Sequence, residues 1–99
     1  MIYILPRTDR TIVGGSYELG NENEAVDSAE TESLLARARG LVPKLADATV
    51  LEARVGLRPA RAGGPRVERV GDVIHCYGHG GAGVTLSWGC ARRVVELAA

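Results

Sequence analysis

The chain has 99 residues and a formal net charge of zero, because twelve Lys and Arg side chains balance twelve Asp and Glu side chains. This length excludes a two-domain enzyme and leaves room for one domain at most. A net charge of zero gives no overall field that would attract nucleic acid or an anionic membrane. The longest uncharged stretches are too polar to form a membrane helix, which needs roughly 20 apolar residues. We therefore expect neither nucleic acid nor a membrane as a partner.

The first half of the chain is predicted to contain a hairpin followed by a helix. Residues 2–5 and 11–15 are β-branched runs separated by a turn-prone Thr-Asp-Arg. Asp27, with a Glu three residues later, has capping-box spacing, which predicts a helix that begins near Ser28. Pro43 should kink or end that helix. Its amphipathic stripe consists of Leu34, Ala38, Leu41 and Leu45.

The second half is predicted to contain three strands and a second helix. Residues 51–57 alternate apolar and polar side chains, which predicts a strand with one buried side, and further strands are expected at 66–70 and 73–77. A Gly-rich loop at 78–83 then leads into a mostly buried C-terminal helix with Trp88 in the core. These elements predict an α+β fold with a mixed or antiparallel sheet of about five strands.

The Gly-rich loop is the most informative feature for function. Glycines let backbone N–H groups approach a ligand, and the helix N-terminus behind them carries roughly half a positive charge. Residues 78–83 satisfy G-x-G-x-x-G literally, but no acidic residue follows about 20 positions later, so we reject a Rossmann fingerprint. A site for an anion or an electron-rich ring and a mere tight connection both remain open.

Charge is distributed unevenly along the chain. Residues 18–32 hold six acids and no Lys or Arg, whereas 54–69 hold five arginines and one Glu. Both stretches are compatible with solvated surfaces that contribute little beyond solubility. An anion site in the basic stretch is the more specific alternative.

Two segments resemble a known family. Residues 73–91, which begin Val-Ile-His-Cys-Tyr-Gly-His-Gly-Gly-Ala-Gly, resemble the signature of the D-amino-acid oxidase family. Residues 56–61, Gly-Leu-Arg-Pro-Ala-Arg, resemble its substrate-anchoring strand, and residues 3–6 and 13–15 match in the same order. The resemblance therefore covers essentially the whole chain.

The resemblance implies roles for individual residues. Arg58 would bind the substrate carboxylate as a bidentate fork, and the backbone carbonyl of Gly81 would hold the substrate amine. The segment 80–85 would cradle FAD, where the helix dipole stabilises negative charge. The resemblance implies no catalytic acid or base, because the orientation of the substrate toward the flavin provides most of the catalysis. The implied cofactor-binding residues are Gly80, Gly81, Ala82, Gly83, Val84 and Thr85.

The implied activity is FAD-dependent oxidative deamination of D-amino acids to 2-oxo acids, ammonia and hydrogen peroxide, with oxygen as the second substrate. The resembled portion is the C-terminal part of a two-domain FAD-dependent oxidase fold. Residues 1–99 are therefore expected to form a single segment without the N-terminal dinucleotide-binding domain. The alternative is a non-catalytic remnant, or a split subunit that needs a complementing N-terminal FAD-binding chain. We expect a homo-oligomer or that complementing domain as partner.

Three arginines and one tyrosine bear on the class of substrate. Arg61 and Arg66 could help Arg58 hold a second carboxylate, which would favour acidic D-amino acids, or they could form a solvated face. Tyr77 is compatible with either a core residue or a wall of the active site.

The remaining candidates are His75, His79, Cys76 and Cys90. They could bind a metal, but their spacing fits no closed zinc site, so we predict no metal. The resembled family usually has Asn or His at Cys76, and an aromatic at Ala82. Two cysteines without a disulfide framework, and no leader sequence, predict a cytoplasmic protein with two free thiols.

Overall fold

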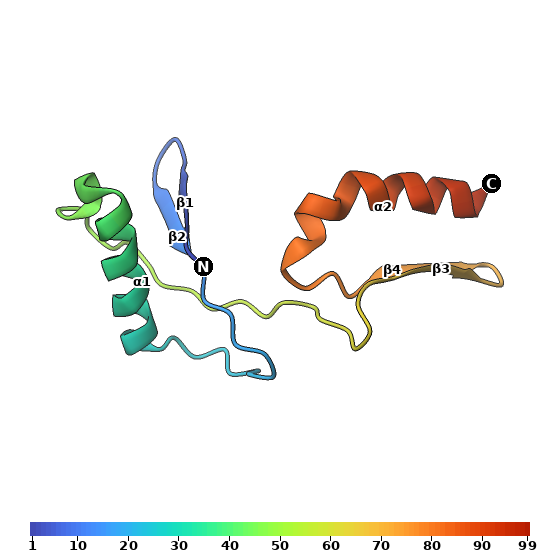
Figure 1. The fold of residues 1–99 in the computed structure, drawn as a ribbon, viewed down its shortest axis with the longest axis horizontal. Coiled ribbons are helices and arrows are strands. Elements are labelled where there is room, and N and C mark those ends of the chain that lie inside the picture. Colours follow the sequence, from blue (N-terminus) through green and yellow to red (C-terminus); the bar gives the residue numbers. More distant parts are fainter. The chain divides into compact units, whose positions relative to one another are not determined.

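The computed structural model describes residues 1–99, which form two compact units, 1–56 and 57–99 (Figure 1). Two helices and two separate two-stranded antiparallel sheets give the α+β content that the sequence predicts. Neither helix is long and apolar enough to cross a membrane. The elements are β1 (Tyr3–Pro6), β2 (Thr11–Gly14), α1 (Ser28–Leu41), η1 (Pro43–Leu45), β3 (Arg66–Val70), β4 (Val73–Tyr77), η2 (Gly80–Ala82) and α2 (Gly83–Ala98).

The N-terminal hairpin is confirmed by the pairing of β1 with β2. Tyr3 lies opposite Gly14, and Pro6 lies opposite Thr11. A Cβ at Gly14 would overlap the Tyr3 ring, and Gly15 has φ +139° with no room for a Cβ beside the backbone of Met1. The hairpin therefore requires glycine where β2 ends.

The helix α1 begins where the sequence predicts. The carboxylate of Asp27 accepts hydrogen bonds from the backbone N–H groups of Ala29 at 2.8 Å and Glu30 at 3.1 Å, which caps the first turn. The helix ends at Leu41, and Pro43 begins a 3-10 turn instead of continuing it. The helix contacts β2, and Ala38 on α1 is the one fully buried apolar side chain, at 1% exposure.

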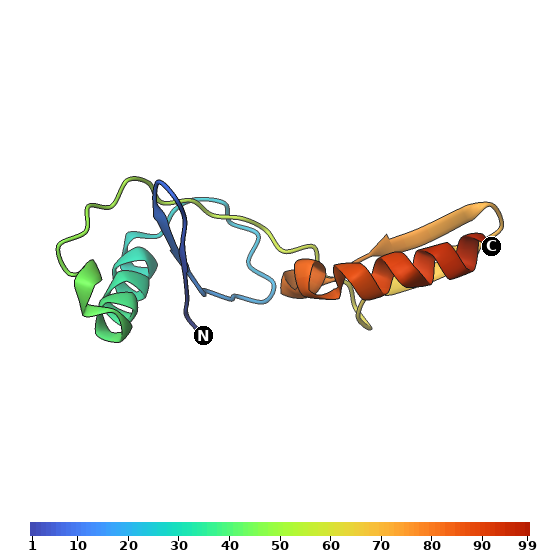
Figure 2. The same ribbon diagram turned by 90° about the horizontal axis from the view of Figure 1, so that it is seen from above.

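The unit 57–99 consists of the β3–β4 hairpin and α2. Both strands are predicted by the sequence, and they pair from Arg66 opposite Tyr77 to Val70 opposite Val73. The helix α2 runs beside this hairpin in both views and contacts each strand (Figures 1 and 2). Its partly buried positions are Cys90, Val94 and Leu97, which share one face of the helix.

The predicted strand at 51–57 is wrong, and so is the sheet of about five strands. Residues 51–57 pair with no other segment. The alternation of apolar and polar residues predicts which side chains lie on the same side of an extended segment. A strand also needs a neighbouring strand to which its backbone N–H and C=O groups can form hydrogen bonds. The ion pair between Arg54 and Glu52, at 2.7 Å, is compatible with a locally extended backbone, because side chains two residues apart then lie on the same side.

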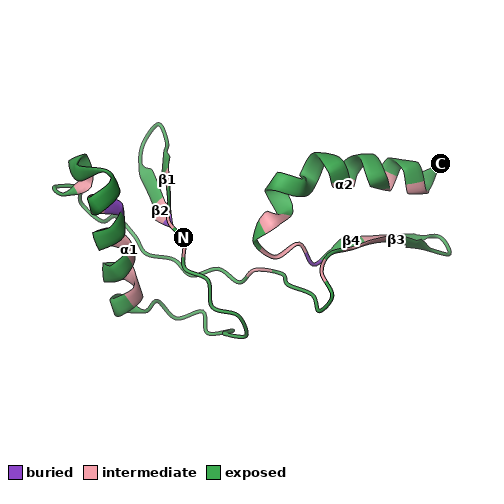
Figure 3. Ribbon diagram, viewed as in Figure 1, coloured by how far each residue is buried: buried purple, intermediate pink, exposed green.

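The prediction of a mostly buried C-terminal helix is also wrong. Val84 is 90% exposed, Val95 70% and Trp88 88%, so Trp88 is not a core residue. Most of α2 is exposed (Figure 3). The helix contacts the hairpin along one face, and the apolar side chains on the rest of its circumference lie in solvent. Periodicity identified the apolar positions but could not tell how many faces of the helix would be covered.

Candidate functional site

The backbone of residues 58–60 is fixed against the Gly-rich segment. The N–H of Gly80 donates to the carbonyl of Pro59 at 3.0 Å, and Ala60 forms an isolated β-bridge with His79. The N–H of Ala60 also donates to the carbonyl of Arg58 at 2.8 Å, which makes a tight turn around Pro59. These contacts fix the position of the backbone from which the Arg58 side chain extends.

Arg58 and Gly81, the two predicted substrate-binding residues, lie in contact. A Cβ built on Gly81 would be 3.4 Å from both Cδ and Nε of Arg58, and 3.6 Å from its Cζ. A Cβ at Gly81 would therefore be in ordinary van der Waals contact with the arginine, and a larger side chain would compete with the arginine for space. Arg58 is partly buried, which restricts the directions in which its guanidinium group can point.

The segment 80–85 is divided between two helical elements and is not one continuous loop. Gly80–Ala82 form the 3-10 turn η2, and Gly83, Val84 and Thr85 are the first residues of α2. Gly80 has φ +56°, and a Cβ there would meet nothing within 4 Å. Ala82 at the N-cap has no side chain that could accept a hydrogen bond from the first turn.

This segment suits an electron-rich ring or an anion, as FAD binding requires. The glycines leave the backbone uncovered, and the N-terminus of a 16-residue helix supplies partial positive charge beside it. The six predicted cofactor-binding residues are contiguous at this helix start. Their chemistry fits the flavin that the sequence implies.

The two arginines Arg61 and Arg66 converge on Tyr77. The guanidinium of Arg66 donates to the Tyr77 hydroxyl at 3.4 Å, stands 5.9 Å from the ring centroid and also pairs with Glu68. Arg66, and to a smaller extent Arg61, lower the pKa of the Tyr77 hydroxyl below its ordinary value. Arg66 likewise lowers the pKa of the Glu68 carboxyl. Tyr77 is 47% exposed and is not a core residue.

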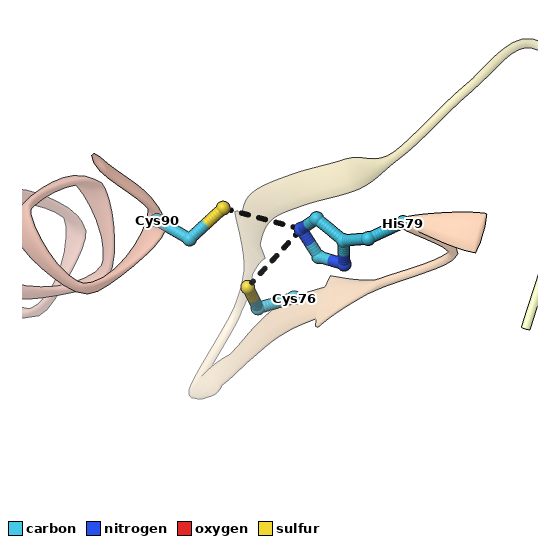
Figure 4. A group of neighbouring side chains, drawn as sticks. All are labelled: Cys76, His79 and Cys90. Carbon is cyan, nitrogen blue, oxygen red and sulfur yellow. Dashed lines mark hydrogen bonds between the residues drawn. The ribbon is translucent and has the colours of Figure 1, made fainter. Parts of the chain in front are cut away.

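The structure also gathers three side chains that the sequence interpretation had set aside. Nε2 of His79 lies 3.1 Å from Sγ of Cys90 and 3.9 Å from Sγ of Cys76 (Figure 4). Both thiols are free, as predicted. Partial desolvation raises the pKa of the Cys90 thiol, and the neighbouring Cys76 raises it further. His75, by contrast, stacks edge-on with Tyr77.

Sequence spacing gave only a weak signal for this group. Cys76 and His79 are three residues apart at the end of β4, which already places them close together. Cys90 joins them only because α2 turns back along the hairpin. The helix face that carries Cys90 could have been recognised, but the side of the hairpin on which it docks could not.

Comparison with known proteins defines the class to which the chain belongs. Residues 1–97 match the model of the family described as FAD dependent oxidoreductase. The match extends over nearly the whole chain, so the chain belongs to this family. The resemblance drawn from residues 56–61 and 73–91 is thereby confirmed at the level of the family.

Particular relatives narrow the comparison. The chain is 45% identical to a D-amino-acid oxidase of Rubrobacter xylanophilus over 99% of its own length, and 42% identical to one of Streptomyces coelicolor over 97%. It is 33% identical to a human D-aspartate oxidase over 98%. These alignments cover 31%, 31% and 30% of the respective relatives, so the chain spans about a third of their length.

Proposed function

We propose that the chain is the substrate-binding and flavin-binding part of an FAD-dependent D-amino-acid oxidase, which yields 2-oxo acids, ammonia and hydrogen peroxide. The observation that carries this proposal is the contact between Arg58 and Gly81. The arginine would meet the carboxylate of an amino acid, and the backbone of the exposed residue Gly81 beside it would meet the amine. The names of the relatives, D-amino-acid oxidase and D-aspartate oxidase, support the same substrate class.

In this proposal each residue has a separate task. Arg58 binds the substrate carboxylate through two parallel N–H···O bonds, which Lys could not reproduce. The carbonyl of Gly81 accepts a hydrogen bond from the substrate amine. Together they fix the orientation of Cα toward residues 80–85, where FAD would supply the two-electron acceptor.

We further propose that sequence outside these 99 residues completes the oxidase. The relatives are about three times as long as the region matched, and a dinucleotide-binding domain, within the same polypeptide or as a complementing chain, would hold the remainder of FAD. D-amino acid and oxygen are then the small-molecule partners, and a homo-oligomer is an alternative assembly. A non-catalytic remnant with the same local fold is the second candidate function.

Titration of the 99-residue chain with FAD tests the first requirement, by following the quenching of flavin fluorescence. We expect saturable binding that weakens about tenfold, or about 1.4 kcal/mol, in Gly81→Val, because the new side chain fills the space beside Arg58. Gly89→Val is the matched control, since a Cβ at Gly89 meets nothing within 4 Å. Equal weakening in both variants would contradict a site at Gly81.

The same titration has a second stage that tests Arg58. D-alanine added to the FAD-loaded chain should perturb the flavin spectrum, and Arg58→Gln should abolish that perturbation while FAD still binds. Arg54→Gln is the control, because Arg54 is a solvent-exposed partner of Glu52. A folded chain that binds no FAD would favour the non-catalytic remnant, and a D-alanine response that survives Arg58→Gln would remove Arg58 from the substrate site.

A further inference from the structure

We propose that Cys76, His79 and Cys90 form a binding site for one Zn²⁺ ion, with two thiolates, one imidazole nitrogen and a fourth position open to solvent. The ligand atoms of all three side chains lie within 4.8 Å of one another (Figure 4). Both sulfur atoms approach the same nitrogen, Nε2 of His79. Three protein ligands and one exchangeable position are the arrangement of catalytic zinc sites, so a water molecule would complete the coordination here.

The distances agree with tetrahedral coordination. Bonds of about 2.3 Å from zinc to sulfur and about 2.0 Å from zinc to nitrogen place neighbouring S and N ligands about 3.5 Å apart in a tetrahedron. The observed separations from Nε2 are 3.1 Å to Cys90 and 3.9 Å to Cys76, which lie on either side of that value. The two sulfur atoms lie within 4.8 Å of each other, against about 3.8 Å between two thiolates in a zinc tetrahedron, so side-chain movements of up to about 1 Å would bring all three ligands to the ion.

The donor set selects the kind of metal. Thiolate and imidazole ligands favour zinc and other soft or borderline ions over Mg²⁺ and Ca²⁺, which prefer oxygen. Cys76 is exposed, whereas His79 and Cys90 are partly buried, so the ion has a path from solvent to the site. Binding replaces the two thiol protons by the metal and releases both protons to solvent, without any change of oxidation state.

The position of the group gives the ion a structural task. Cys76 lies on β4, His79 precedes η2, and Cys90 lies on α2, so one ion would join the three elements that build the unit 57–99. That unit has no fully buried apolar side chain of its own, since the one such residue, Ala38, belongs to the unit 1–56. Small units with so little core are commonly stabilised by a metal or a disulfide.

The test uses the reduced 99-residue chain and Zn²⁺ in competition with a chromophoric chelator. We expect one equivalent of zinc to bind with a Kd in the micromolar range or tighter, with about two protons released per ion. Cys76→Ser and Cys90→Ser should each weaken binding by at least about tenfold, because serine preserves the side-chain shape but is a poor zinc ligand. His75→Asn is the matched control and should bind zinc like the unaltered chain, because His75 lies outside the group.

Two further measurements use the unaltered chain, so they test the zinc site even if a serine variant folds poorly. Co²⁺ substituted into the unaltered chain should give an absorption band of thiolate-to-metal charge transfer. Zinc should also protect both cysteines from alkylation and raise the thermal midpoint of unfolding. Failure to compete for zinc, a cobalt spectrum without thiolate ligation, or equal loss in His75→Asn would each overturn the proposal. Conversion of the two thiols to a disulfide that zinc cannot prevent would overturn it as well. None of these readouts depends on FAD.

Discussion

The two units of the chain differ in what holds their elements together. In residues 1–56, a helix with an Asp27 cap lies against a hairpin, and Ala38 provides a buried contact. In residues 57–99 no apolar side chain is fully buried, although both units leave many large apolar side chains exposed. Polar contacts join segments of this second unit. An example is Arg69, which donates to the carbonyl of Leu97 at 3.1 Å and joins β3 to the end of α2.

The difference coincides with where the candidate chemistry lies. All predicted substrate-binding and cofactor-binding residues, and the Cys76, His79 and Cys90 group, belong to the unit 57–99. Five of its glycines have positive φ, a left-handed backbone conformation that glycine adopts without strain. The unit 1–56 contains a capped helix and a hairpin but none of these candidate residues. The candidate residues therefore lie in the unit that has no fully buried apolar side chain.

The largest expected effect that sharpens this comparison comes from Gly78→Ala in the unit 57–99. Gly78 is buried with φ +82°, and a Cβ there would lie 2.6 Å from Cβ of Arg61. We expect a loss of about 3 kcal/mol in the free energy of unfolding, from the left-handed backbone and the steric overlap together. Gly71→Ala, with φ +59° and no atom within 4 Å, should cost only about 1 kcal/mol. Denaturant unfolding measures the free energy of unfolding of both variants. Equal decreases would contradict the prediction, because they would mean that the overlap with Arg61 adds no cost.

A smaller effect is expected from Ala38→Leu in the unit 1–56. Ala38 is 1% exposed, so the added carbons have no room, and we expect a cost of about 1–3 kcal/mol. Ala36→Leu, at an exposed position two residues earlier on the same helix, should change stability by less than about 0.5 kcal/mol. The shift of the denaturation midpoint checks this difference. Equal tolerance of both substitutions would mean that Ala38 does not provide the packing contact of its unit.

The smallest expected effect concerns the pH dependence of Tyr77. Arg66 lowers the pKa of its hydroxyl in the folded chain from the ordinary value of 10.0, so the folded state loses this proton at lower pH than the unfolded state. The resulting stabilisation is complete above the ordinary pKa and disappears as the pH falls through the lowered one. Tyrosinate absorbance, with Tyr77→Phe subtracted, measures this titration. Arg66→Gln should move the pKa of Tyr77 upward, whereas Arg69→Gln should leave it in place, and an equal shift in both would contradict the assignment to Arg66.

Several local elements could be predicted because neighbouring residues determine them. Asp27 and Pro43 fixed the start and end of α1, and the β-branched runs fixed all four strands that the structure contains. The family was also predictable, because residues 73–91 form a contiguous motif. The strand at 51–57 and the buried environment of Trp88 could not be predicted correctly, because pairing and burial depend on partners distant in the sequence.

The sequence by itself determined the local elements, the glycines that precede α2 and the family to which the chain belongs. Only the tertiary structure decided that Arg58 lies against Gly81, and that Cys90 joins Cys76 and His79. The physical reason is the range of the interactions involved. Capping, turns and alternation act between residues a few positions apart, whereas the docking of α2 on its hairpin brings together side chains whose spacing along the chain carries no information about their distance.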